Sequence, residues 1–475
     1  MSGSSPGGSV VLSRSNASEL LHSALAEAVR AFPAVFEAVG FPEDAGAFRA
    51  RYPALMPRFE AARLASAERR DIASHIVSWF EDQVLWQDDS GQKPLAAALA
   101  EPAAPLPLRS HTFGAAPGWQ PSLVYNGRRF EADALNELGA ALVERRVVTA
   151  AAGRALSSIQ ADLLQDGRLN LSGRRIAVLG GGAEMAPTRF WLEAGAEVLW
   201  VDIAPPPENW FESDTLAGRL HWAEAGADLL SQPREILATL LAFSDGTPMD
   251  LGLYAYAPGQ AREVRLTSVM NALVGAMPAG LVASATILVS PTTPTGLSAE
   301  DRDAMAARLA ARPGWESVLG RIGALGRGDG AEVMGGAAAT RTVVAIQGTS
   351  YQAAQYVGKV LTAERWNQPD ATMRVSANTA AITRTRSLAH PVFTAAFGGA
   401  SAFGVETLTP RQSRCLNGLL AVHDWLAEQP PVPGAVRVHG GIHTLPYPLE
   451  SALKIAAGIG FARSPRLLKG LLGGR

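Results

Sequence analysis

The spacing of apolar residues divides the chain into a helical first part and a later part in which strands and helices alternate. From about Ala17 to Asp88, apolar side chains recur at intervals of three and four, which predicts amphipathic helices. The next segment, residues 92–121, is rich in proline and alanine, and we expect a linker or an extended strap. Helical spacing returns at residues 132–165.

After Gly173 the pattern becomes that of a parallel sheet. Short apolar runs alternate with amphipathic helical segments, and the runs read RRIAVLGGG, EVLWVDI and DLGLYAYAP. Parallel strands that are buried on both faces form continuous apolar runs of this kind, joined by crossover helices. The sequence therefore predicts an α/β protein with a doubly wound parallel sheet and an additional N-terminal all-helical domain.

These changes of pattern set the expected domain boundaries. We expect a flexible tail at residues 1–14, a helical domain with a proline-rich linker at 15–125, connecting helices at 126–172, a parallel-sheet domain at 173–410 with an insertion at 291–338, and a C-terminal cover segment at 411–475.

Composition and charge exclude several classes of function. The net charge is -2 and no run of Lys and Arg is present, so we do not expect nucleic acid as a partner. The single cysteine, Cys415, excludes intramolecular disulfides and indicates a reducing, cytoplasmic location. The longest apolar stretch, residues 271–291, is interrupted by glycine and proline, so no integral membrane span is predicted. No metal site is predicted either.

The segment from Arg174 to Asp202 has the pattern of a dinucleotide site. An apolar run ends at Gly180, Gly181 and Gly182, a helical segment follows, and the next apolar run ends at Asp202. Glycines let the backbone approach a pyrophosphate, and an acid at the second strand end accepts hydrogen bonds from a ribose. A carboxylate there repels a 2′-phosphate, which favours NAD over NADP. A glycine turn without a ligand and a site for S-adenosylmethionine remain alternatives.

From Asn170 to about Leu388 the chain resembles the short-chain dehydrogenase/reductase superfamily. The segments that carry the resemblance are NLSGRRIAVLGGG, LEAGAEVLWVD, MDLGLYAYAPG and MRVSANTAAITRTR. The YAPG sequence is closer to the enoyl-acyl carrier protein reductase branch of this superfamily than to the Asn-Asn-Ala-Gly form. The resemblance implies a Rossmann fold, an NAD(P) cofactor, and reduction or oxidation of a carbonyl, hydroxyl or enoyl group.

The resemblance also assigns cofactor residues beyond the glycines. It places Asp228 near the adenine amino group and Thr385 near the nicotinamide carboxamide. Ala257 and Pro258 lie at the end of the fourth strand, which packs against the cofactor, and Ile203 follows the ribose-binding Asp.

The catalytic pattern of the family is matched only in part. The family uses a Tyr, a Lys four residues later and a Ser at the end of the fifth strand. Tyr351 stands at the expected place, but Gln355 replaces the Lys. Lys359 lies on the same predicted helix and is the candidate catalytic Lys for either Tyr351 or Tyr356. Ser290, at the end of a predicted strand, is the best candidate for the catalytic Ser. Another match is Asn271, near the structural Asn of the family.

Two further departures concern the cofactor loop. The loop lacks two of the family's three glycines, and Glu184 brings a negative charge toward the expected phosphates. The sequence thus leaves two functions open. The first is an NAD(P)-dependent oxidoreductase acting on a small apolar metabolite, and the second is a catalytically inactive dinucleotide-binding sensor or scaffold. A small-molecule substrate is the expected partner, and assembly into a homo-oligomer is left open.

Overall fold

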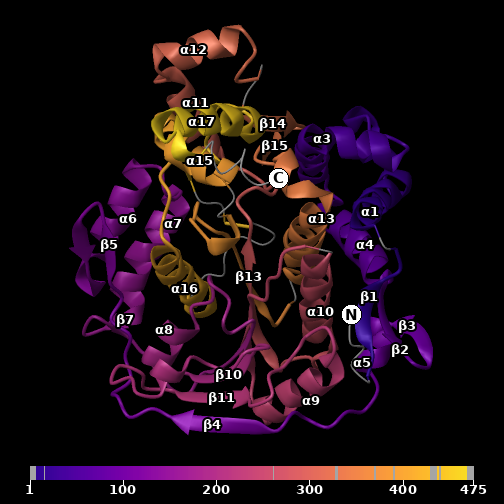
Figure 1. Cartoon of the computed structure of the whole chain (residues 1–475), viewed down its shortest axis with the longest axis vertical. Helices are drawn as coiled ribbons and strands as arrows, with labels where there is room; N and C mark the ends of the chain where they lie inside the picture. The colour runs from indigo at the N-terminus through magenta and orange to yellow at the C-terminus, as the bar shows by residue number, and fades with distance from the viewer. Residues whose placement is uncertain are drawn as a thin grey trace.

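A mostly parallel sheet lies at the centre of the protein (Figure 1). The computed structural model describes residues 7–14, 16–259, 261–326, 330–368, 371–388, 391–427, 436–437 and 440–467. Within these residues the central sheet has seven strands. They are β4 (Leu108–Thr112), β9 (Arg175–Leu179), β10 (Glu197–Val201), β11 (Arg219–Ala223), β12 (Met249–Leu253), β13 (Val282–Val289) and β16 (Arg374–Thr379).

The strand order is β16-β13-β12-β9-β10-β11-β4. The chain builds outward from β9 through β10 and β11, then crosses to the other side of β9 and continues through β12, β13 and β16. These six strands are parallel, and β4 pairs antiparallel with β11 at one edge. The predicted α/β class with a mostly parallel sheet is confirmed. β11 was not predicted as a strand, and β4 forms within the segment expected to be a linker or strap.

Helices cover both faces of this sheet, which explains why its strands are so apolar. All five residues of β12 are buried. Successive residues of β9 alternate between two apolar clusters, with Ile176 and Val178 in one and Ala177 and Leu179 in the other. The first cluster includes α6 (Leu135–Glu144), α7 (Ala150–Ser158), α8 (Thr188–Glu193) and α16 (Pro410–Leu426). The second includes α9 (Pro233–Ser244), α10 (Arg262–Ala276) and a π-helix (Ala353–Leu361).

The N-terminal region is not all-helical, so that part of the prediction is not confirmed. Its helices are α1 (Ala17–Ala31), α2 (Pro33–Phe36), α3 (Ala45–Ala65), α4 (Arg69–Glu81) and α5 (Leu95–Leu99). Its described residues also hold a three-stranded antiparallel sheet of β1 (Ser9–Leu12), β2 (Val84–Asp88) and β3 (Gly91–Pro94). β1 lies in the segment expected to be a flexible tail, of which residues 1–6 are outside the described residues. The N-terminal helices share one apolar cluster with the central sheet.

Buried charges join the N-terminal helices to the π-helix. Arg63 donates two hydrogen bonds of 2.8 Å to Glu60, and the Tyr356 hydroxyl donates one of 2.6 Å to the same carboxylate. Glu364, in α14 (Thr362–Trp366), lies 3.2 Å from Arg69. Because Glu60, Arg63 and Glu364 are buried, their charges depend on these partners.

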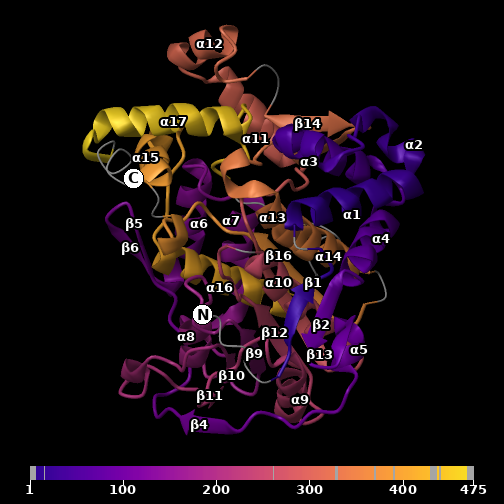
Figure 2. The ribbon, with the colours of Figure 1, turned by 45° about the vertical axis from the view of Figure 1, so that its right-hand side comes forward.

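The insertion and the remaining short elements surround this framework. The insertion contains α11 (Ala299–Ala310), α12 (Gly314–Arg321) and the strand β14 (Ala331–Met334), which pairs with β15 (Ala337–Thr340). In Figure 2, α12 projects from the end of the molecule that is opposite β4. The other elements are β5 (Leu123–Tyr125), β6 (Arg128–Phe130), β7 (Leu164–Gln165), β8 (Arg168–Leu169) and α13 (Gly348–Gln352).

Two apolar helices, α15 (Pro391–Ala400) and α17 (Leu449–Arg463), pack very closely near the carboxyl ends of the parallel strands (Figure 1). A Cβ built on Gly399 falls 1.9 Å from the carbonyl oxygen of Ala456, and one on Gly460 falls 1.8 Å from that of Ala395. Only glycine allows the two backbones to approach this closely.

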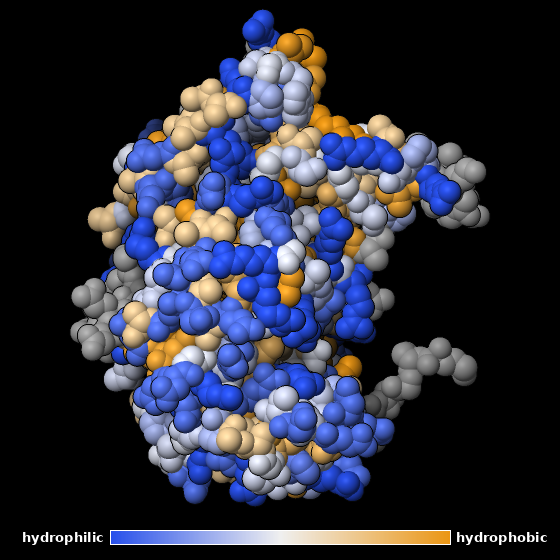
Figure 3. Space-filling model, turned by 90° about the vertical axis from the view of Figure 1, so that its left-hand side faces the viewer, coloured by the Kyte–Doolittle hydropathy of each residue, from blue (hydrophilic) through white to orange (hydrophobic). Residues whose placement is uncertain are grey.

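The described helices do not include one that is both long enough and apolar enough to cross a membrane. The face shown in Figure 3 is largely hydrophilic, with small apolar areas scattered over it.

We predict that Gly399→Ala destabilises the protein by about 1–3 kcal/mol, because the new methyl group overlaps the backbone of α17. Gly398→Ala is the matched control, since its Cβ meets Gly460 at an ordinary 3.6 Å. That variant should gain up to about 1 kcal/mol from helix propensity. Chemical denaturation measures both, and equal effects would contradict the close packing of α15 on α17.

Candidate functional site

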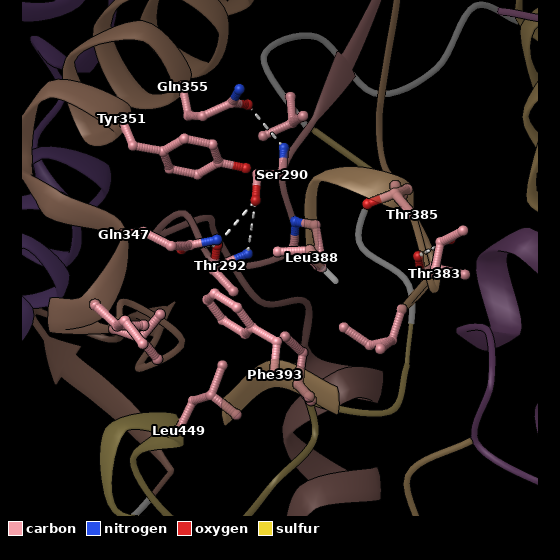
Figure 4. A pocket seen from close by; sticks show the side chains of 18 of the residues that line it. Ser290, Thr292, Gln347, Tyr351, Gln355, Thr383, Thr385, Leu388, Phe393 and Leu449 are labelled. Atoms are coloured by element: carbon pink, nitrogen blue, oxygen red, sulfur yellow. Dashed lines mark hydrogen bonds between the residues drawn. The ribbon is translucent and has the colours of Figure 1, made fainter. Parts of the chain in front are cut away.

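A cavity of about 680 Å³ lies at the carboxyl ends of β12, β13 and β16 and reaches the loop that follows β9. Ligands of open α/β sheets bind outside these strand ends, where the strand order reverses. Apolar side chains of α15 and α17, including Phe393, Phe397, Leu449 and Leu453, form one wall. Across the cavity from Phe393 and Leu449 lies a polar wall with Ser290, Thr292, Gln347, Tyr351 and Gln355 (Figure 4). Glu263 and Lys359 also line the cavity, and we count them with this polar wall.

Two consecutive helices bring three of these polar residues to the cavity: α13 carries Tyr351, and the π-helix that follows it carries Gln355 and Lys359. Tyr351, Gln355 and Lys359 follow one another at intervals of four residues, and all three line the cavity. In an α-helix, positions eight residues apart point about 80° away from each other. The wider turns of the π-helix change this relation, and π-helical segments occur frequently at functional sites.

Tyr351 and Ser290 face each other in the cavity. Figure 4 shows the Tyr351 hydroxyl directed toward the Ser290 side chain. The Ser290 hydroxyl lies 2.8 Å from that of Thr292, which donates a hydrogen bond to Gln347. Burial raises the pKa of Tyr351, the Glu263 carboxylate raises it further, and a hydrogen bond with Ser290 opposes both. The phenol therefore carries its proton at neutral pH.

Gln355 has a structural task that the sequence did not reveal. Its amide oxygen accepts a 2.9 Å hydrogen bond from the Ser290 backbone N–H, and its amide nitrogen donates one of 2.6 Å to Glu263. The residue that replaces the expected Lys therefore fixes the end of β13 and holds a buried carboxylate at the cavity wall.

Glu263 and Lys359 are buried ionisable groups at this wall. Burial raises the pKa of Glu263 from 4.5 to about 7, while Lys359 and the hydrogen bond from Gln355 oppose the shift. Burial lowers the pKa of Lys359, and Glu263 opposes this change. Lys359 Nζ donates a 2.9 Å hydrogen bond to the Leu288 carbonyl at the end of β13. Glu263 was not predicted from the sequence. It lies in the first turn of α10, the helix that follows β12, and this place in the chain puts it near the carboxyl ends of the strands.

Tyr356 and Asn271 lie elsewhere. The Tyr356 hydroxyl reaches Glu60 in the buried cluster described above, so the structure does not bring it to the cavity with Lys359. Asn271 donates hydrogen bonds to the Gly358 carbonyl at 2.8 Å and to the Thr362 hydroxyl at 3.3 Å. It therefore fastens α10 to the π-helix, which is a structural role.

The structure explains the glycines after β9 without a ligand. Gly180 has a φ of +89°, and a Cβ on it would lie 2.3 Å from the Ala255 backbone nitrogen. A Cβ on Gly181 would lie 2.6 Å from the Trp200 indole, and that ring also approaches Gly182. α8 begins only at Thr188. The N–H groups of the three glycines also donate hydrogen bonds within the chain, to the Val201 carbonyl and to Asp202. The role of these glycines in holding a pyrophosphate stays a prediction.

The predicted adenosine residues lie outside the cavity lining. Asp202 accepts a 3.0 Å hydrogen bond from the Gly182 backbone N–H, so its carboxylate lies beside the glycine loop. Ile203 is 73% exposed. Asp228 accepts hydrogen bonds from the Leu230 N–H and the Ser231 hydroxyl within its own turn. All three residues follow the neighbouring strands β10 and β11.

The predicted nicotinamide residues lie closer to the cavity. Pro258 and Thr385 line it, and Ala257 is flanked by the lining residues Tyr256 and Pro258. The described residues do not contain a group of three or more His, Cys, Asp or Glu side chains arranged to hold a metal ion.

Glu263 should make stability depend on pH. Its pKa is about 7 in the folded protein and 4.5 when unperturbed, so between these values the folded state binds more protons than the unfolded state. Stability therefore falls as pH rises through this window, by about 3 kcal/mol in total. Glu263→Gln should flatten the decline in denaturation curves recorded from pH 4.5 to 7.5. A decline of unchanged size in the variant would contradict the assignment.

Comparison of the chain with protein-family models found no match, and comparison with curated proteins found no similar sequence. The assignment of the site therefore depends on the geometry of the cavity and on the residues that line it.

Proposed function

We propose that the protein is an NAD(H)-dependent oxidoreductase that acts on a carbonyl or enoyl group of a small apolar molecule. The observation that carries the proposal is the position of Tyr351 beside Ser290, at the carboxyl end of β13, inside an apolar cavity. The order of the six parallel strands supports it, because dinucleotide-binding folds share this order.

The polar wall can provide the proton that such a reduction requires. A reduced nicotinamide, when bound, supplies hydride. Tyr351 is protonated at neutral pH and can donate its proton to the substrate oxygen, which gains negative charge as hydride is added to the substrate. The Ser290 hydroxyl lies beside the Tyr351 hydroxyl and can orient the same oxygen. The raised pKa of Tyr351 favours reduction over oxidation, because oxidation needs the phenolate as a base.

The apolar wall sets the class of substrate. A volume of about 680 Å³ is within the usual range for small-molecule sites, which is about 300–1,000 Å³. Phenylalanine and leucine side chains from α15 and α17 exclude water from this space and favour an aliphatic or aromatic group.

The residues suit the adenosine and nicotinamide ends of a dinucleotide better than they suit its central pyrophosphate. Asp202 lies at the end of β10 beside Gly182, as a ribose partner requires, and its charge favours NAD over NADP. Pro258 and Thr385 line the cavity near Ser290, where a nicotinamide is expected. The N–H groups of Gly180, Gly181 and Gly182 are engaged within the chain, so we expect other residues to supply positive charge to the pyrophosphate.

One observation favours a second candidate, a protein that binds the dinucleotide without catalysis. Gln355 is neutral and is engaged with Ser290 and Glu263, so it does not lower the pKa of Tyr351 as a Lys would. Turnover measurements distinguish the two candidates.

Tyr351→Phe should reduce turnover about 100-fold or more, with little change in KM, because it removes the proton donor and keeps the ring. The measurement is NADH oxidation with a panel of carbonyl and enoyl compounds. Tyr356→Phe is the matched control, and its turnover should persist because Tyr356 contacts Glu60 outside the cavity. If Tyr351→Phe matched the wild type, Tyr351 would not be the donor.

Calorimetric titration with NADH, NADPH and S-adenosylmethionine should show the tightest binding for NADH. Asp202→Ala should weaken it, because the ribose partner is lost, and should improve relative binding of NADPH, because a charge that repels its 2′-phosphate is removed. If neither nicotinamide bound, the proposed oxidoreductase would be wrong, and binding of S-adenosylmethionine alone would favour a methyltransferase.

A further inference from the structure

Three arginines and Glu184 lie within electrostatic range of Arg414, and Glu184 lines the cavity. Arg189 belongs to α8, Arg386 follows β16, and Arg411 and Arg414 lie near the start of α16. We call these four residues the arginine cluster. Glu184, Arg189, Arg386 and Arg411 all act electrostatically on Arg414, which places the charges close together.

The cluster carries more positive than negative charge. Glu184 lies 3.7 Å from the Arg386 guanidinium and accepts a 3.0 Å hydrogen bond from the Arg386 backbone N–H. Arg189 pairs with Glu193 at 3.2 Å. Two carboxylates therefore face four guanidiniums. The Arg386 side chain is 87% exposed and is free to reorient toward a ligand.

The surroundings of Arg414 are unfavourable for a positive charge when no ligand is bound. Its Nε atom is buried, and the described residues offer it no hydrogen-bond acceptor. Burial and the three neighbouring arginines lower its pKa. Arg411 lies in the first turn of α16, a long helix whose first turn has no acid, where the helix dipole disfavours positive charge. A bound anion would offset each of these costs.

The cluster adjoins the cavity described above. Ala183, Glu184 and Met185 line the cavity on one side, and Thr385 and Leu388 line it on the other. An anion held by the cluster can therefore belong to the molecule that occupies the cavity.

We propose that the arginine cluster binds a phosphate group of the cavity's ligand. Guanidinium groups match phosphate oxygens in geometry and charge, and they would replace the backbone N–H groups that the glycine loop does not offer. The phosphate belongs either to the pyrophosphate of the dinucleotide, an assignment that rests on the proposed function, or to a phosphate-bearing substrate. Glu184 limits the affinity, because its carboxylate competes with the phosphate for the same arginines.

The test uses two substitutions with opposite expected effects. We would titrate the full-length protein with inorganic pyrophosphate, NADH and coenzyme A by calorimetry, at low and at about 0.15 M ionic strength. Arg414→Ala should weaken binding of the phosphate ligand about 10-fold or more, and Glu184→Gln should tighten it. Arg321→Ala, on α12, is the control and should change nothing. Thermal unfolding of each variant separates loss of binding from loss of folding.

The outcomes separate this inference from the proposed function. If NADH responds to both substitutions, the cluster holds the pyrophosphate of the dinucleotide. If coenzyme A or pyrophosphate responds and NADH does not bind, the phosphate site stands and the oxidoreductase proposal fails. If NADH binds with equal affinity to the wild type and both variants, the oxidoreductase proposal stands and the cluster is not a phosphate site. Failure of all three probes to bind would overturn the inference.

Discussion

The attachment of the end of β13 to the π-helix determines the geometry of the candidate site. Gln355 binds the backbone N–H of Ser290, and Lys359 binds the carbonyl of Leu288, so two side chains from one helix hold the last residues of the strand. Backbone groups at a strand end need partners when they are buried. Satisfying them in this way places Ser290 beside Tyr351 and brings Glu263 to the same wall.

The π-helix also connects the N-terminal region to the site. On its other side, Tyr356 joins the buried pair of Glu60 and Arg63, so α3 is bound to the π-helix, which continues directly from α13, the helix that carries Tyr351. Breaking a buried ion pair is costly, because one charge is then left without a partner. The N-terminal helices and the central sheet therefore behave as parts of one packed unit, with one apolar cluster in common.

Charged side chains lie at two places in the site. At the polar wall, Glu263 and Lys359 are removed from water, and burial moves their pKa values toward each other. At the cavity edge, the arginine cluster and Glu184 remain partly open to solvent. We propose that the first place serves proton transfer and that the second binds an anion. Apolar side chains of α15 and α17 line the same cavity.

The sequence by itself determined the features that depend on local pattern. Apolar runs separated by amphipathic helices predicted the parallel sheet, because such strands are buried on both faces, and they identified β9, β10 and β12. The resemblance to the short-chain dehydrogenase/reductase superfamily added β13 and β16. The sequence also predicted that Tyr351 and Ser290 belong together. β11 was missed because RLHWA is short and contains polar residues, and β4 was missed because its pairing with β11 is not local.

Only the tertiary structure decided the features that depend on contacts between distant segments. Whether Tyr351 or Tyr356 faces the cavity depends on which side of the helix packs against α3. The glycines after β9 are required by Trp200 and Ala255 on neighbouring strands, whereas the sequence suggested a ligand. Glu263 and Arg414 read as ordinary surface charges in the sequence. Their burial, and hence their chemistry, arises because segments about 100 or more residues away in the chain fold over them, and no local pattern records such contacts.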